Sequence, residues 1–292
     1  MRVSLTRRPG RAAITLVGAV ALTIGGLAMV PEAAGAADGL STKPNVLLVH
    51  GAFADGSSWS NVIARLQRDG YHVTASQTPN TSFADDVAVV QRDLRVLHGP
   101  TLIAAHSYGG AVISQAAEGA ANVVGLVYLA AFAPDTGETL NYINNTLAPL
   151  LPSQADAVPI DLPNVGANNA PFLMIRENRF RDDFCADCSR VEAAILAAAQ
   201  TPLNASATTA PLQGTPAWKQ VPSWYQISAE DRLINPAAQK IMAGRLDPTG
   251  SHTLTLESSH ASLVSHAAQV AQFIERAATN CSPTASPCHR KQ

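Results

Sequence analysis

The ten residues Thr101–Gly110 constrain the fold of this chain more than any other segment. They read Thr-Leu-Ile-Ala-Ala-His-Ser-Tyr-Gly-Gly, an apolar run followed by a serine and then by residues that can form a helix. Ala105 and Gly109 stand two positions before and two positions after Ser107. Small residues are needed there because a sharp strand-to-helix turn forces the serine backbone into unfavourable dihedral angles. The segment therefore predicts a buried strand, a strained turn with Ser107 at its tip, and a helix behind it.

Strand and helix patterns alternate on both sides of this segment. The predicted strands lie at residues 45–50, 71–76, 101–105, 123–129, 223–228 and 252–257. Apolar residues recur at helical spacing at about 59–66, 83–97, 109–119, 236–245 and 262–278. Strands that alternate with helices predict an α/β fold, with a mostly parallel sheet flanked by helices and joined by right-handed crossovers.

The alternation stops between about residues 135 and 217. This stretch is rich in Pro, Asn and Ala, and one helix is expected in it, at 190–200. A disordered linker is the simple alternative, but several apolar residues indicate that something is covered: Phe172, Leu173, Met174, Ile175, Phe180 and Phe184. Open α/β sheets place their sites at the carboxyl ends of the strands. We therefore interpret the stretch as a cap insertion after the fourth predicted strand.

The N-terminus has the pattern of a secretory signal peptide. Four arginines precede an uncharged stretch at 12–30, and Ala34-Gly-Ala36 offers small residues at cleavage spacing. We expect cleavage after Ala36, which leaves residues 37–292 as one α/β domain with a polar, cysteine-containing tail at 281–292. A retained transmembrane anchor is the alternative. The pair Arg7-Arg8 leaves both Sec and twin-arginine export open.

Charge and cysteine content narrow the class of protein. Without residues 1–36 the chain carries 16 basic and 21 acidic side chains, a formal charge of −5. No basic stripe is present, so nucleic-acid binding is not expected. The four cysteines are an even number in a chain predicted to be exported, which favours disulfides. We expect the local pairs Cys185–Cys188 and Cys281–Cys288, each closing a short loop, although a link from the tail to the insertion stays open. No metal or cofactor is expected.

The partners that a reactive serine requires lie after two late strands. A serine hydroxyl needs an adjacent base, and the base needs an acid that orients it. Asp231 follows the strand at 223–228, and His260 follows the strand at 252–257. The carboxyl ends of parallel strands share one edge, so both side chains are expected near Ser107. Glu230 and Asp135 are alternative acids.

Acyl-transfer chemistry also needs hydrogen-bond donors that stabilise the negative charge developing on the acyl oxygen. The backbone amide of Tyr108 lies at the predicted helix start. A second amide is expected from Ala52, in a turn where Gly51 lets the chain pass closely, and Phe53 would then form a wall of the substrate pocket. His50 is expected to brace this turn rather than transfer protons.

Taken in order along the chain, these motifs resemble the α/β-hydrolase superfamily. Within it they are similar to small bacterial esterases related to plant salicylate-type methylesterases and hydroxynitrile lyases. The matching segments are residues 50–59, the Ala-His-Ser-Tyr-Gly-Gly turn, residues 218–231 and the Ser-His-Ala segment at 259–261. The resemblance implies a triad of Ser107, Asp231 and His260, with Ala52 and Tyr108 as the oxyanion donors.

Two departures from the pattern bear on the reaction. Cyanogenic members of the group carry a threonine and a lysine where this chain has Gly51 and Ala261, which argues against lyase chemistry. We therefore expect a secreted, cofactor-free serine esterase. It would cleave carboxylic esters of small to medium apolar substrates through an acyl-enzyme, without a membrane in the mature form. A lactonase, amidase or C–C hydrolase with the same triad is the alternative, as is a catalytically silent binding protein on the same fold.

Overall fold

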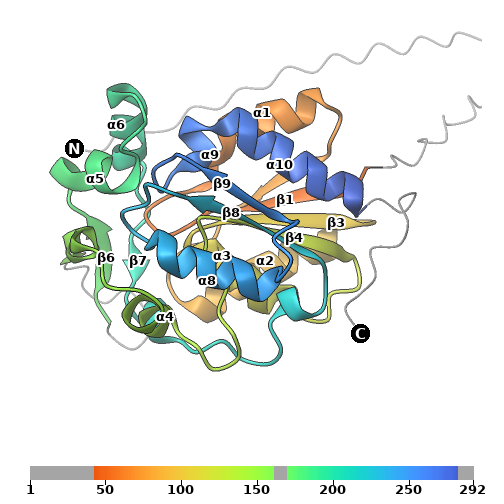
Figure 1. Cartoon of the computed structure of the whole chain (residues 1–292), viewed down its shortest axis with the longest axis horizontal. Helices are drawn as coiled ribbons and strands as arrows, with labels where there is room; N and C mark the ends of the chain where they lie inside the picture. Colours follow the sequence, from red (N-terminus) through yellow and green to blue (C-terminus); the bar gives the residue numbers. More distant parts are fainter. Residues whose placement is uncertain (1–42, 161–169, 282–292) are drawn as a thin grey trace, which may run out of the picture. The chain divides into compact units, whose positions relative to one another are not determined.

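The computed structural model describes residues 43–160 and 170–281, and its centre is a six-stranded sheet (Figure 1). The strands are β1 (Asn45–Val49), β2 (Val73–Ser76), β3 (Thr101–His106), β4 (Val123–Leu129), β8 (Ser223–Ser228) and β9 (Thr253–Leu256). Their spatial order is β2-β1-β3-β4-β8-β9, and every neighbouring pair is parallel. The predicted α/β fold with a mostly parallel sheet is confirmed.

Helices cover both faces of this sheet (Figure 1). One face carries α1 (Ser60–Arg68), α9 (Ser262–Ser265) and α10 (Ala267–Asn280), and the other carries α2 (Phe83–Val96), α3 (Tyr108–Ala116) and α8 (Pro236–Leu246). In β1, Leu47 and Val49 pack with the second group, while Val46 and Leu48 pack with the first. Burial on both faces explains why the strand sequences read as continuous apolar runs.

Local signals fix where helices begin. The Ser82 hydroxyl accepts a hydrogen bond from the Asp85 amide and caps α2, whose first turn also holds Asp86, a favourable position for acidic side chains. The sequence predicted one continuous helix at 262–278. The structure instead divides it into α9 and α10 at His266, which has φ −121° and ψ 33°.

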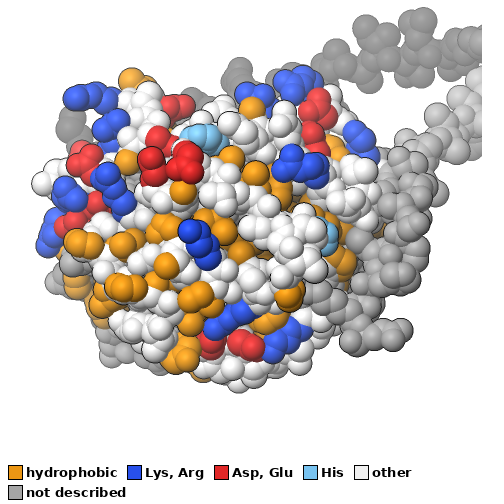
Figure 2. Space-filling view, in the orientation of Figure 1, with side chains coloured by type: hydrophobic (Ala, Val, Ile, Leu, Met, Phe, Trp, Pro, Cys, Tyr) orange, Lys and Arg blue, Asp and Glu red, His pale blue; other side chains and the backbone are white. Residues whose placement is uncertain are grey.

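Residues 135–217, called the excursion below, leave the main sheet after β4 and return at β8. They contain α4 (Leu140–Thr146), a 3-10 turn (Pro152–Asp156), β5 (Ala157–Ile160), β6 (Phe172–Ile175), α5 (Glu177–Phe184), α6 (Arg190–Ala198), β7 (Leu203–Asn204) and α7 (Ser206–Thr209). Strands β5, β6 and β7 form a separate antiparallel sheet. Of these elements only α6 matches an element predicted from the sequence. Acidic and basic side chains are mixed over α5 and α6 (Figure 2).

Of the two predicted disulfides, the structure contains one, and the other includes a residue that the structure does not describe. Cys185 and Cys188 form a disulfide at the end of α5. Cys281 is buried, but Cys288 lies outside the described residues, so the pair Cys281–Cys288 stays a prediction. The expected signal peptide at 1–36 and most of the tail also lie outside them. In the described ranges, no helix combines the length and the apolar character that crossing a membrane requires.

Candidate active site

Ser107 lies at the sharp turn between β3 and α3. Its backbone has φ 53° and ψ −125°, a region that costs energy for any residue other than glycine. Two backbone hydrogen bonds hold the turn against the end of β4. The Ser107 amide donates to Leu129 O, and the Phe132 amide donates to Ser107 O. A Cβ atom at Gly109 would lie 2.5 Å from the carbonyl oxygen of His50. The small residue at this position is therefore a requirement of close backbone packing.

The structure brings Ser107, His260 and Asp231 into one chain of hydrogen bonds. Ser107 Oγ lies 2.8 Å from His260 Nε2, and His260 Nδ1 lies 2.7 Å from Asp231 Oδ2. A carboxylate can only accept, so Nδ1 carries the proton and Nε2 is left to accept from the serine hydroxyl. None of the three residues is more than 7% exposed. They come from the ends of β3, β8 and β9, as the sequence predicted.

The Asp231 carboxylate accepts hydrogen bonds from three donors in addition to the histidine. Its Oδ1 accepts from the amides of Leu233 at 2.7 Å and Ile234 at 3.0 Å, and its Oδ2 accepts from Gln239 Nε2 at 2.7 Å. Gln239 lies on α8 and was not singled out from the sequence. One signal was present, a glutamine on the otherwise apolar buried face of α8, but its partner is set only by the fold.

The alternative acids lie elsewhere. Glu230 is exposed, and its backbone amide donates to Ser258 O. The Asp135 carboxylate pairs with Lys219 Nζ. Neither side chain has a described contact with the imidazole of His260, so the geometry favours Asp231 as its partner.

Two further buried histidines surround the serine. Burial lowers the pKa of His50 and lowers that of His106 well below the usual value, with the nearby His260 contributing to the second effect. Neutral His50 accepts from the Thr78 amide through Nε2 at 3.1 Å, so its Nδ1–H donates to Gly51 O at 2.9 Å. His106 Nε2 lies 2.9 Å from the carbonyl oxygen of His260, and the two rings are 4.5 Å apart.

The turn after β1 lies directly against the serine. A Cβ atom at Gly51 would come within 2.6 Å of Ser107 Cβ, which gives a physical reason for a glycine here in this structure. Ala52, Phe53 and Tyr108 line a cavity of about 320 Å³ together with Ser107. Within the described residues, neither the Ala52 nor the Tyr108 amide has a protein acceptor.

Tyr108 is fixed from its side-chain end. Its hydroxyl donates to Asp86 Oδ2 at 2.6 Å, and the Asn80 amide donates to Asp86 Oδ1 at 2.8 Å. Burial raises the pKa of Asp86 to about 6, against the opposing effect of these two donors. The residue after Ser107 is thus attached to α2 through a buried carboxyl that the sequence analysis did not identify.

The excursion supplies much of the wall of the serine cavity. The described lining contains no Lys, Arg, Asp or Glu; beyond the residues already named it consists of Phe132, Leu140, Asn141, Asn144, Gln154, Ala157, Leu173, Leu203, Thr208, Leu233 and Ile234. A larger cavity of about 630 Å³ lies between β6, α5 and α6, away from Ser107. The first cavity is the one associated with the hydrogen-bonded serine. Its walls are apolar surfaces with a few amide and hydroxyl groups, as is usual for small-molecule sites.

Among the described residues, one cluster has the side chains and spacing of a possible metal site. It consists of Cys185, Asp187 and Cys188, and its two sulfur atoms are bonded to each other. The cluster lies beside the loop that carries His260, as the contact between the Ser259 amide and Asp187 shows.

Comparison with known proteins places this geometry in a family. The alpha/beta hydrolase nvfD of Aspergillus novofumigatus is 23% identical over 257 residues, which cover 81% of this chain and 97% of that protein. A pyrethroid hydrolase from Sphingobium faniae superposes with a TM-score of 0.65 at 22% identity, over 81% of this chain and 97% of the other. The methylesterase MES16 from Arabidopsis gives 0.65 at 18% identity, over 81% and 99%. The model of the alpha/beta hydrolase family matches residues 46–273. The chain belongs to the alpha/beta hydrolase family.

Proposed function

We propose that this protein is a secreted serine hydrolase that cleaves uncharged carboxylic esters through an acyl-enzyme. The observation that carries the proposal is the chain of two hydrogen bonds, 2.8 Å and 2.7 Å long, from Ser107 through His260 to Asp231. The hydrolases and the methylesterase to which the chain is similar support the same class of reaction.

In the proposed reaction, Ser107 Oγ attacks the ester carbonyl carbon while its proton passes to His260 Nε2. Asp231 holds Nδ1–H and stabilises the imidazolium that forms. The imidazolium then protonates the leaving alcohol, and the acyl group stays on Ser107. Water, activated by the same nitrogen, releases the carboxylic acid and restores the hydroxyl.

We assign the amides of Ala52 and Tyr108 to the negative charge that develops on the carbonyl oxygen. The Tyr108 amide is the first of α3 and has no partner within that helix. Both amides lie in residues that line the cavity with Ser107. Removing one donor of this kind typically costs about 10²–10³-fold in kcat.

The cavity supports the choice of substrate class. Its described lining carries no charged side chain, so a substrate carboxylate or ammonium would lose hydration there without gaining an ion pair. Its volume of about 320 Å³ fits an ester of modest size. In this proposal the excursion acts as the cap that selects the substrate. Phe53, in the turn after β1, forms part of the opposite wall of the cavity.

A fluorophosphonate probe and p-nitrophenyl esters test the proposal together. The wild type is expected to label covalently and to hydrolyse p-nitrophenyl butyrate, while Ser107→Ala neither labels nor turns over. The kcat of Ser107→Ala should lie about 10⁶-fold below that of the wild type, as for loss of a triad serine. A correctly folded wild type that neither labels nor hydrolyses any ester would refute the hydrolase proposal and favour the silent binding protein.

Export is part of the proposal and has its own test. The disulfide between Cys185 and Cys188 is typical of oxidising compartments. We expect the protein recovered from culture medium to begin at Ala37. An N-terminal sequence that starts at Met1 would contradict cleavage after Ala36.

A further inference from the structure

The loop at the end of α5 lies against the segment that carries His260. The Ala261 amide donates to Phe184 O at 3.1 Å, and the rings of Phe184 and His260 meet edge to face at 5.3 Å. The residue on each side of His260 is thus contacted by the excursion, because Ser259 also has a partner there. The disulfide between Cys185 and Cys188 closes this loop immediately after Phe184.

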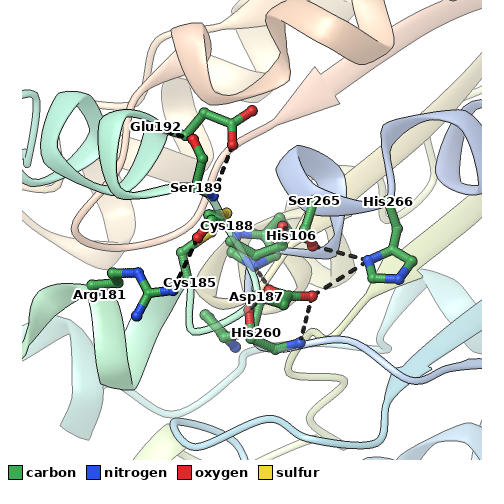
Figure 3. The surroundings of a disulfide bond; sticks show 12 residues. His106, Arg181, Cys185, Asp187, Cys188, Ser189, Glu192, His260, Ser265 and His266 are labelled. Carbon is green, nitrogen blue, oxygen red and sulfur yellow. Dashed lines mark hydrogen bonds and ion pairs between the residues drawn. A yellow bond between two sulfur atoms is a disulfide. The ribbon is translucent and has the colours of Figure 1, made fainter.

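The partner of Ser259 is Asp187, which lies between the two cysteines. One carboxylate oxygen accepts from the Ser259 amide at 3.2 Å, and the other accepts from the Ser259 hydroxyl. The same carboxylate lies 3.4 Å from His266 Nδ1, as Figure 3 shows. Asp187 therefore connects the residue before His260 with the start of α10. Its side chain is 21% exposed, although the residue as a whole, backbone included, is exposed.

The excursion also contacts the loop that carries Asp231, from α5 and from the 3-10 turn at Pro152–Asp156. Arg232 donates from its guanidinium to Asp182 O, on α5, at 2.9 Å. Gln154 Nε2 donates to Leu233 O at 3.0 Å. The loops that carry Asp231 and His260 are therefore both in contact with the excursion.

We propose that Asp187, held in the loop that the Cys185–Cys188 disulfide closes, is a positioning residue for His260. It acts through Ser259, whose amide and hydroxyl it fixes, and it has no contact with Ser107. The disulfide limits the conformations of the loop, so that the carboxylate faces Ser259 before substrate binds. This inference rests on the proposed role of His260 as the base.

The geometry sets the size of the expected effect. Ser107 and His260 must stay within hydrogen-bonding distance for proton transfer, and a misplacement of about 1 Å can cost about 10²-fold in rate. Substrate binding uses the cavity walls, and Asp187 is not among its lining residues. Loss of Asp187 should therefore lower kcat and leave KM nearly unchanged.

Steady-state hydrolysis of p-nitrophenyl butyrate by Asp187→Ala, Asp187→Asn and Asp182→Ala tests the proposal. We expect Asp187→Ala to lose between about tenfold and 10²-fold in kcat, with KM within about twofold. Asp187→Asn keeps an acceptor for the Ser259 amide and should retain more activity. Asp182→Ala is the matched control, because its side chain pairs with Arg179 and Arg181 and does not contact the His260 loop.

A double-mutant cycle separates positioning from a general loss of structure. If Asp187 acts through the Ser259 hydroxyl, Ser259→Ala should add little to the loss already caused by Asp187→Ala. Additive losses in kcat, or an Asp187→Ala enzyme with kcat within about twofold of wild type, would overturn the proposal. If Asp187→Ala does not fold, wild-type kcat in both Ser259→Ala and Asp187→Asn would do the same.

The disulfide is tested with Cys185→Ser/Cys188→Ser. We expect a loss of kcat similar to that of Asp187→Ala, and dithiothreitol should reduce wild-type kcat without affecting the double variant. Wild-type kcat in the double variant would refute the role of the disulfide. All of these measurements require an active wild type. An inactive wild type would count against the proposed function itself, whereas an active wild type with unaffected variants counts only against the positioning role.

Discussion

The main sheet and the excursion are built by different means and contribute different things to the site. Strands β1, β3 and β4 consist of residues almost all fully buried, and their apolar side chains hold the Ser107 turn rigidly between two layers of helices. The excursion is made of short elements joined by polar contacts, such as the pairs of Arg179 with Asp156 and Asp183. Partly exposed pairs of this kind contribute little stability individually.

From this difference we infer that the main sheet and the excursion have different roles in the site. In the proposed mechanism, the sheet presents the nucleophile, the oxyanion turn and the acid. The excursion walls the cavity and contacts the loops of Asp231 and His260. Substitutions in the sheet should therefore change the rate for every ester, whereas substitutions in the cavity wall should change which ester is preferred.

The largest expected effect after loss of the nucleophile is that of Asp231→Asn. The variant should fold, because an amide can still accept from the Leu233 and Ile234 amides. It cannot hold the Nδ1–H tautomer of His260 as a carboxylate does, so kcat should fall by about 10⁴-fold. Measurement of kcat with p-nitrophenyl butyrate checks this. Full activity would contradict the role of Asp231 as the partner of His260.

A smaller effect is expected from the turn after β1, through His50. Its Nδ1–H fixes Gly51 O, and in a trans peptide this aims the Ala52 amide in the opposite direction. His50→Asn keeps a donor near the Nδ1 position and should stay within about tenfold of wild-type kcat. His50→Gln reaches only the Nε2 position and should lose about 10²-fold, as for a misplaced oxyanion donor. Equal kcat values for the two variants would contradict this orientation of the peptide.

An effect on stability is expected at Asp86, which contacts the site through the Tyr108 hydroxyl. Its raised pKa, about 6, means that the folded state holds the proton more tightly than the unfolded chain. The resulting stabilisation is fully present below pH about 4 and is lost as the pH rises through about 6. Between pH 4 and pH 8, the wild type should lose about 2–3 kcal/mol relative to Asp86→Asn. Urea unfolding at several pH values measures this difference, and the exposed neighbour Asp85→Asn is the control. Parallel pH profiles for the wild type and Asp86→Asn would rule it out.

The smallest effect is expected in the excursion wall. Leu173 on β6 lines the serine cavity, so Leu173→Ala should enlarge it and favour longer acyl chains. The preference for butyrate over acetate should rise by about fourfold for each methylene newly accommodated. Val191→Ala, on the exposed face of α6, should leave the chain-length profile unchanged. An equal loss of rate for all esters in Leu173→Ala would contradict the expectation that the excursion determines which ester is preferred.

The sequence predicted the parts of the fold that depend on local pattern. The apolar runs gave the strands because both faces of the sheet are covered, and Ser107 was located by the small residues that its turn requires. The excursion was poorly predicted since β7 has two residues and β5 contains Pro159. Neither has enough length to show a period of two.

Around the candidate site, the sequence by itself determined which side chains can react. Ser107, Asp231 and His260 were chosen from their positions after strand ends, and the fold places them together. Gln239, Asp86 and Asp187 could not be identified in this way, because the partner of each is set by packing: Asp86 and Asp187 contact residues far away in the chain, and Gln239 reaches Asp231 from the next helix. Only the tertiary structure decides these contacts, since a buried or partly buried polar group takes whichever partner the packing of distant elements brings to it.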